Sequence, residues 1–468
     1  MPLRFRSKTA GASPLTYKPC NAAKTPLWKI SKPRNRLGLP AKIIHTKITW
    51  IHRMTNTETD FLPNKLKQMQ SFALVTGGAG LAIMILSWLA GVANFYQGYL
   101  IGWFLALGFA LGGLLVLCVH NLAHGGWGFL LRRPAEASAM TLLPLMILFL
   151  PIMFSLDRVY PWAIRDASGT SVYATDPIVG SKLHYLNHSF IWIRYFIYAV
   201  IWVGGARLFW TYSGKQDETG DIVWRQKMRF MAGPMALIYI LTLTLASVDF
   251  LMSLEPQWFS SIYGVMVASG HMLSMLSFGL VFLTWLSKWE PVKSAFTLER
   301  QHDIGKLLFA FIIFWAYIQV SQFIIYWHAN LPEEITWYMN RWSPGFNSVS
   351  WILVLSQFVV PFLFLISRST KRNSQTLVIA ACFLLVIRVV DMYWMVAPSI
   401  NIPETRDLYP VATKAMSGSA IHLLDLVGVV TFGSLWFGIF LYYFRQRPIL
   451  PVNDPYFSLG VQSKEPNA

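Results

Sequence analysis

Two pairs of ionisable side chains, each spaced three residues apart, stand inside apolar stretches of the sequence. Arg388 and Asp391 form one pair, and His422 and Asp425 form the other. Residues three apart in a helix share a face, and a charge in hydrocarbon is costly unless it faces a bundle interior. A carboxylate or imidazole held there could accept the protons that oxidation of a quinol releases.

Other ionisable residues lie in the same half of the predicted membrane region. Asp249 is near the end of one apolar stretch and His271 is near the middle of the next, whereas Arg194 fits a structural role better. We predict a proton relay or a quinol headgroup site here; ion pairs that only lock helices together are the alternative. The candidates are Asp249, His271, Arg388, Asp391, His422 and Asp425.

A second set of polar residues is predicted to form a proton path on the inner side. Its members are Glu136, His302, Asp303, Lys306, Gln319 and Gln322. Polar side chains in hydrocarbon usually hydrogen-bond between helices, but they can also hold water. His120 and His124 share a helix face, yet the following glycines favour a capped helix end over a metal or haem site. We predict no metal site and no catalytic residue.

The composition indicates that membrane helices position these residues. Of 468 residues, 54% are hydrophobic and 13% are charged, which is roughly half the charge of a soluble domain. Cys20, Cys118 and Cys382 form no C-x-x-C pattern, so the chain offers no site of its own for an iron–sulfur cluster or c-type haem. Neither a P-loop nor a dinucleotide fingerprint is found, and nothing predicts a nucleic-acid partner.

Ten apolar stretches approach the length needed to cross about 30 Å of hydrocarbon. They are 72–95, 99–120, 137–155, 189–210, 230–251, 259–286, 306–328, 348–367, 376–397 and 420–444. Lys and Arg are enriched in alternate connections, which places both termini in the cytoplasm. The predicted class is an all-α polytopic membrane protein, and the long outer connection 155–188 could hold a partner or a short surface helix.

Charge divides the chain into three parts. The net charge is +17, and residues 1–53 contain Lys and Arg but no Asp or Glu. We predict a basic, disordered extension at 1–64, a ten-helix membrane domain at 65–447 and a cytoplasmic tail at 448–468. Two interpretations of residues 1–53 stay open: binding to anionic lipid, or a misassigned start, with Met54 as the true beginning.

A short internal repeat indicates duplication. Val248–Pro256 and Val390–Pro398 each contain Val-Asp followed by Pro seven residues after the Asp. Both segments end helices that run in the same direction in the predicted topology. We therefore expect two parallel four-helix units, helices 2–5 and helices 6–9, with helices 1 and 10 outside them.

Several segments together resemble one protein family. They are Ser247–Val265, His124–Ala137, Tyr160–Ala163, Gly305–Phe323 and Val390–Pro398. The sequence over roughly 65–445 is similar to the ActF-type membrane subunits of bacterial alternative complex III, a quinol:cytochrome c oxidoreductase. These subunits belong to the wider NrfD-like, or polysulfide-reductase membrane-subunit, family.

The resemblance implies a subunit of the bacterial inner (cytoplasmic) membrane that carries no redox centre. It implies partners: a homologous NrfD-like subunit that binds quinol, an iron–sulfur subunit, and subunits with haem c. Quinol binding to this chain itself and proton translocation stay open. Asp249 and Asp391 match Asp positions of the family. Arg388 stands where His is more usual, and an Arg cannot relay protons at ordinary pH.

Two other functions compete with this one. A stand-alone secondary transporter would also have ten spans, a parallel repeat and intramembrane charges. A structural scaffold subunit would use every buried charge in a neutral pair. Whether the chain is itself an enzyme is open, because the resemblance assigns the redox chemistry to partner subunits.

Overall fold

The computed structural model describes residues 61–92, 94–123, 125–329, 331–343, 346–400, 421–451 and residue 454. The predicted basic extension up to residue 60, His124 and most of the predicted tail lie outside the described residues. In the described part the chain is helical, and extended pairing is limited to one isolated bridge between Arg165 and Ser171. The predicted all-α class is confirmed.

Ten helical segments of the described chain are long and apolar enough to cross a membrane. In chain order they are α2 (Phe61–Leu89), α3 (Phe95–Ala123), α4 (Gly126–Ala139) with α5 (Leu142–Phe154), α8 (His188–Thr219), α9 (Ile222–Phe250), α10 (Tyr263–Leu286), α12 (Leu298–Ala329), α14 (Asn347–Leu353) with α15 (Val360–Ile366), α17 (Ser374–Ile400) and α20 (Leu423–Phe444). The chain is thus a multi-pass membrane protein, while the side on which each terminus lies stays a prediction.

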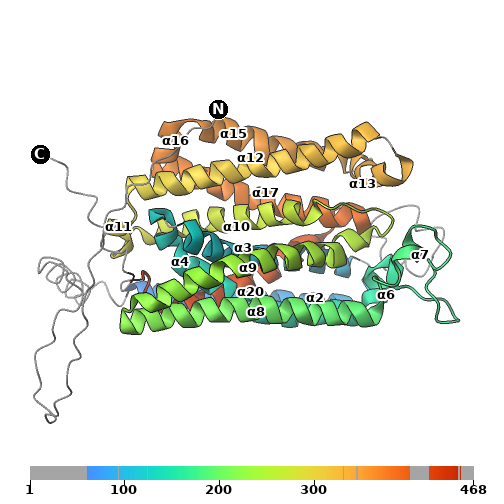
Figure 1. The fold of residues 1–468 in the computed structure, drawn as a ribbon, viewed down its shortest axis with the longest axis horizontal. Coiled ribbons are helices and arrows are strands. Elements are labelled where there is room, and N and C mark those ends of the chain that lie inside the picture. Colours follow the sequence, from blue (N-terminus) through green and yellow to red (C-terminus); the bar gives the residue numbers. More distant parts are fainter. Residues whose placement is uncertain are drawn as a thin grey trace, which may run out of the picture. The chain divides into compact units, whose positions relative to one another are not determined.

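The short elements lie at the two ends of the helix bundle. We call one the α7 end, because it contains α6 (Leu156–Val159), α7 (Val179–Lys182) and α13 (Pro332–Trp342) (Figure 1). The other is the α11 end, which contains α11 (Val292–Ala295) and α16 (Arg368–Arg372). The 3₁₀ turns η1 (Pro161–Ala163) and η2 (Met252–Leu254) complete the short elements of the α7 end.

Local sequence signals define the hairpin between α8 and α9. Asn187 accepts a hydrogen bond from the Phe190 amide at the start of α8. Gly220 ends that helix with a φ of 65°, a left-handed conformation that glycine adopts without steric cost. Asp221 then caps α9 by accepting from the Val223 amide at 3.4 Å. These three residues therefore define a tight connection between the antiparallel helices α8 and α9.

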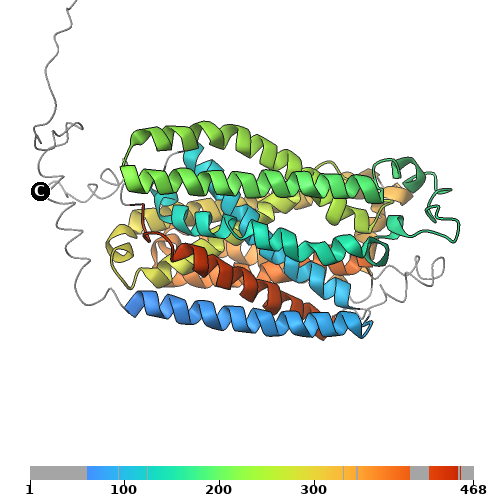
Figure 2. The same cartoon turned by 90° about the horizontal axis from the view of Figure 1, so that it is seen from below.

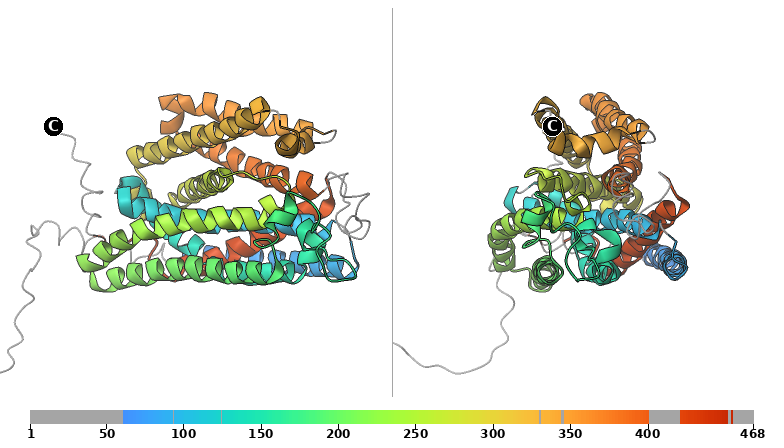
Figure 3. Two further views of the ribbon diagram at one scale, coloured as in Figure 1. Left: turned by 45° about the vertical axis from the view of Figure 1, so that its right-hand side comes forward. Right: turned by 90° about the vertical axis from the view of Figure 1, so that its right-hand side faces the viewer.

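The helices form two four-membered rings, as the repeat predicts. In the first ring α3 packs on α4, α5 packs on α8, α8 packs on α9, and α9 returns to α3. In the second ring α10 packs on α12, α12 on α15, α14 and α15 on α17, and α17 on α10. The end view separates the two groups clearly (Figure 3, right). Each helix of the first ring therefore has a counterpart of the same rank in the second.

The first helices of the two rings pack against each other at the centre. α3 contacts α10, and each of them also contacts the last helix of the other ring, α17 and α9 respectively. This reciprocal pattern is what a two-fold axis along the bundle between α3 and α10 produces. In the membrane-crossing window, 94% of α3 and 83% of α10 are buried inside the chain.

Helices α2 and α20 stand outside the rings and run side by side (Figure 2). α20 reaches α3 through glycines: a Cβ on Gly102 would lie 2.2 Å from the Gly428 carbonyl oxygen, and a Cβ on Gly428 would lie 2.0 Å from the Gly98 oxygen. Small residues at such crossings allow two helix backbones to touch in a membrane.

The eighth span contains a π-helical segment, η3 (Val354–Val359), between α14 and α15. Such wide turns often mark functional positions in helices. Gln357 lies in this segment, and its side chain is fully buried against α17.

Candidate functional site

Asp249 forms the core of a buried ion pair close to the α7 end. Arg194 of α8 donates to both carboxylate oxygens at 2.8 Å, and the Tyr198 hydroxyl donates to Oδ2 at 2.7 Å. The guanidinium also stacks 3.8 Å from the Tyr185 ring centroid. Asp249 itself has no exposed surface. Both of its oxygens are therefore occupied, and the pair ties α8 to α9.

Asp391 lies in a different setting, between α17 and the π-helical segment. Arg388, one turn earlier in α17, donates to its Oδ2, and Gln357 Nε2 lies 3.5 Å from the same atom. Oδ1 is buried and has no hydrogen-bond partner among the described residues. A buried carboxylate oxygen without a partner is costly to maintain, so this atom, like Oδ1 of Asp425, is a position where a proton could bind.

Arg388 and His271 lie on opposite sides of α10. Arg388 Nε donates to Ser274 Oγ at 3.2 Å, and its guanidinium lies against Gly270, where a Cβ would be 2.4 Å away. His271 faces the first ring, with Nδ1 3.4 Å from the Tyr239 hydroxyl. The structure thus pairs Arg388 with Asp391 inside the second ring, whereas His271 makes its polar contact with the first ring.

His422 and Asp425 form a helix cap instead. His422 Nδ1 accepts from the Leu424 amide at 3.1 Å, and Asp425 Oδ2 accepts from the His422 amide at 3.0 Å. Gln97 of α3 also donates to Asp425 at 2.9 Å. This reciprocal arrangement is a capping box, so the spacing of three residues has a local structural explanation at this site.

Glu136 belongs to a buried network at the α11 end. It accepts from Arg132 at 3.0 Å and from Arg133 at 2.7 Å, while Arg133 also pairs with Asp217 of α8. Arg447 Nη1 lies 3.7 Å away. These charges neutralise one another inside the bundle, which explains how two arginines in the middle of α4 can remain buried.

The other predicted inner residues do not gather around Glu136. Asp303 and Lys306 form an exposed pair at 2.7 Å near the start of α12, with His302 half-buried beside them. Gln319 is also half-buried. Gln322 lies toward the α7 end of α12, where it accepts from Ser260 Oγ at 2.9 Å.

Two buried acids had no place among the predicted site residues. Glu255 accepts from Arg341 of α13 at 2.9 Å, from Asn340 at 2.9 Å and from Ser399 of α17 at 2.5 Å. Burial lowers the pKa of Arg341, whereas the carboxylate of Glu255 opposes that shift. Two features of the sequence could have drawn attention to this pair: a Glu inside Ser247–Val265, and an Arg among aromatic residues. Only the fold shows that the two residues are in contact.

Asp454 is the second such acid, from the segment that follows α20. It accepts from Arg132 at 2.8 Å and from Arg225 of α9 at 2.6 Å, and it is 4% exposed. The predicted division between membrane domain and tail gave no hint of this contact. Asp454 thus holds the segment after α20 at the α11 end, where it joins the network around Glu136.

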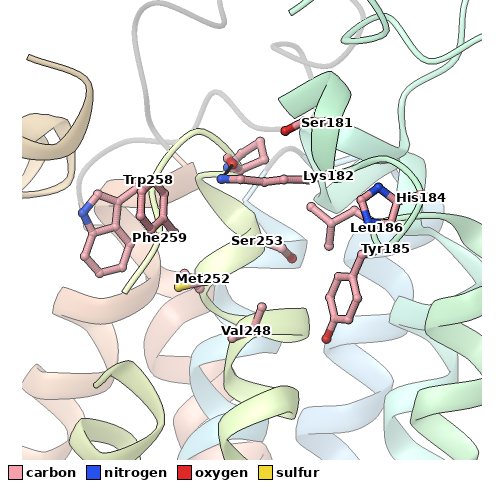
Figure 4. Close-up of a pocket in the computed structure, with 11 residues that line it drawn as sticks. Ser181, Lys182, His184, Tyr185, Leu186, Val248, Met252, Ser253, Trp258 and Phe259 are labelled. Atoms are coloured by element: carbon pink, nitrogen blue, oxygen red, sulfur yellow. Dashed lines mark hydrogen bonds between the residues drawn. The ribbon is translucent and has the colours of Figure 1, made fainter. Parts of the chain in front are cut away.

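A cavity of about 330 Å³ opens at the α7 end, between the connection 181–186 and the end of α9 (Figure 4). Tyr185, Leu186, Val248, Met252, Trp258 and Phe259 supply its apolar wall, and Lys182, His184, Ser181 and Ser253 supply polar groups. Partial burial lowers the pKa of Lys182. Tyr185 connects this cavity to the Asp249 ion pair.

No family model matches the chain, and no curated protein matches it. The resemblance to the ActF-type subunits is therefore carried by the sequence motifs alone.

Proposed function

We propose that the chain is the ActF-type integral membrane subunit of a bacterial respiratory quinol:cytochrome c oxidoreductase, of the alternative complex III kind. It supports quinol oxidation without a redox centre of its own. Iron–sulfur clusters and haem c belong to partner subunits, and a homologous NrfD-like subunit binds the quinol. The site of action is the cytoplasmic membrane.

The buried polar groups on the two sides of α10 carry this proposal. Oxidation of a quinol releases protons, so such a complex needs groups that can take up and pass on protons within the membrane. Asp391 offers a carboxylate oxygen with no hydrogen-bond partner among the described residues. Arg388 holds the carboxylate in place and keeps its charge. His271 and Tyr239 supply the polar groups on the side of the first ring.

The architecture gives independent support. Two parallel four-helix rings with two outer helices are the arrangement that the resemblance implies. The most distinctive stretch of the resemblance, Ser247–Val265, supplies Asp249 and Glu255 and forms part of the cavity wall.

A scaffold function is the second candidate, and one observation favours it. Asp249 and Glu255 are each held by several donors, so these two acids act as locks between helices. Under this alternative Asp391 is a lock as well. Measuring turnover distinguishes the two functions. If Asp391 is only structural, its substitution either prevents assembly of the complex or leaves turnover unchanged.

Purification of the tagged chain from its own membranes in mild detergent tests the proposal. We expect a c-type haem spectrum, an iron–sulfur subunit and a second ten-helix subunit in the same particle. A colourless protein that purifies alone would contradict the proposal. It would favour a stand-alone secondary transporter, for which substrate uptake is the next assay.

A further inference from the structure

The cavity at the α7 end lies at the level where two membrane spans finish. α8 begins at His188 and α9 ends at Phe250, and the lining residues lie close to these two positions. Figure 4 shows Val248, Met252 and Ser253 along the end of α9, with Lys182 crossing above them. In a bilayer this is the depth at which hydrocarbon gives way to headgroups.

Lys182 is fixed at the mouth of the cavity. Its Nζ donates to the Pro256 carbonyl oxygen at 2.8 Å and lies 3.4 Å from the Gln257 carbonyl oxygen. The ammonium also lies 5.0 Å from the Phe259 ring centroid. An ammonium has three N–H donors, so one remains for a ligand after these two carbonyls. The long side chain is thereby held in one position before any ligand arrives.

The acids around the cavity are already engaged. Asp249 is held by Arg194 and Tyr198, and Glu255 is held by Arg341. Asp176, which faces Lys182, accepts from the amides of Ile178 and Val179 at 2.8 and 2.7 Å. None of the described lining residues is acidic. The mouth therefore offers a fixed cation, and no carboxylate stands ready to accept protons from a neutral diol such as a quinol.

We propose that this cavity binds an anionic phospholipid, with the phosphate at Lys182 and the upper part of one acyl chain along Val248, Met252 and Phe259. A volume of about 330 Å³ is at the low end for small-ligand pockets, so it accommodates part of a lipid. The remaining chain length lies on the apolar outer surface of the spans. This site is additional to the proposed function and does not depend on it.

Lipid titration followed by native mass spectrometry tests the site. The protein is purified as it exists in its membranes, stripped of lipid in detergent, and titrated with phosphatidylglycerol or with phosphatidylcholine. We expect Lys182→Gln to weaken phosphatidylglycerol binding about fivefold, the effect of one basic residue near an anionic lipid, and to leave phosphatidylcholine unchanged. Lys182→Arg should retain binding. Lys288→Gln, which removes an exposed charge at the α11 end, should have no effect.

A second variant tests the apolar part. Val248→Phe fills the cavity from α9 and should weaken binding of both lipids, while the melting temperature in detergent reports that the fold is intact. Equal phosphatidylglycerol affinity in Lys182→Gln and the original protein overturns the proposal. Displacement of the lipid by millimolar inorganic phosphate would also overturn it, because it would indicate a site for free anions. The co-purifying subunits have no bearing on either result.

Discussion

Asp249 and Asp391 occupy the same position of the Val-Asp…Pro repeat, in the fourth helix of each ring, yet only Asp249 has both carboxylate oxygens hydrogen-bonded. Asp249 takes its arginine from a neighbouring helix, whereas Asp391 takes Arg388 from its own helix. The first pair joins two helices. The second leaves one oxygen for another partner, so the two rings differ: Asp249 joins two helices, and Asp391 is a candidate proton site.

Asp391→Asn should lower proton-coupled turnover of the assembled complex by about 100-fold, because positioned proton transfer contributes at least that much to a rate. Quinol-dependent cytochrome reduction and proton release by the purified complex provide the measurement. Asp157→Asn is the control, because it removes an exposed carboxylate. Unchanged turnover and proton release in Asp391→Asn would remove the relay role.

Asp249→Asn should destabilise the protein by about 3–5 kcal/mol, because it leaves Arg194 buried without its counter-ion. Replacing both partners, in Arg194→Met with Asp249→Leu, should cost much less. Thermal unfolding in detergent compares the two variants. If the single and double variants had the same unfolding midpoint, the ion pair would not hold the two helices together as its geometry indicates.

Asp454→Asn should lower stability by about 3 kcal/mol, since Arg132 and Arg225 both lose a buried counter-ion. Asp303→Asn is the control, because its pair with Lys306 is exposed and exposed pairs contribute about 1 kcal/mol or less. The readout is the unfolding midpoint in detergent. A shift no larger than that of Asp303→Asn would show that the residue does not anchor the chain at the α11 end.

Gly428→Ala should destabilise the contact between α20 and α3 by about 1–3 kcal/mol, because the new methyl group would meet the Gly98 carbonyl oxygen. Gly433→Ala, in the same helix, meets nothing within 4 Å and should be neutral or slightly stabilising. Both variants are compared by thermal unfolding. Similar behaviour of the two would mean that the backbones are not in close contact.

Hydropathy predicted the spans well, and the largest differences have one cause. The first span was predicted at 72–95 but extends over Leu62–Leu89, and the third was predicted at 137–155 but extends over Gly126–Phe154. Each of these spans carries charged side chains in its first half, which resemble a loop to a hydropathy scale. In the third span Arg132 and Arg133 are neutralised by Glu136 and Asp217. Hydropathy scores residues singly and cannot recognise such compensation.

The sequence predicted which residues belong to the candidate site, but not which of them contact one another. Intramembrane charge pointed to Asp249, His271, Arg388 and Asp391, and all four are buried. Spacing alone could not tell the capping box at His422 from the ion pair at Arg388. Glu255 and Arg341 were missed, because their contact joins segments far apart in the chain. Such contacts depend on tertiary packing, which the sequence alone does not reveal.

The burial of α3 and α10 has a mechanical consequence. In the membrane-crossing window α3 is 94% buried, whereas α2 is 22% buried and α14 with α15 is 28% buried. Adjustment to a thicker or thinner bilayer, by tilting or by local lipid deformation, acts on helices that touch lipid. The outer helices therefore absorb changes of bilayer thickness, and the central pair that carries His271 keeps its geometry in membranes of different composition.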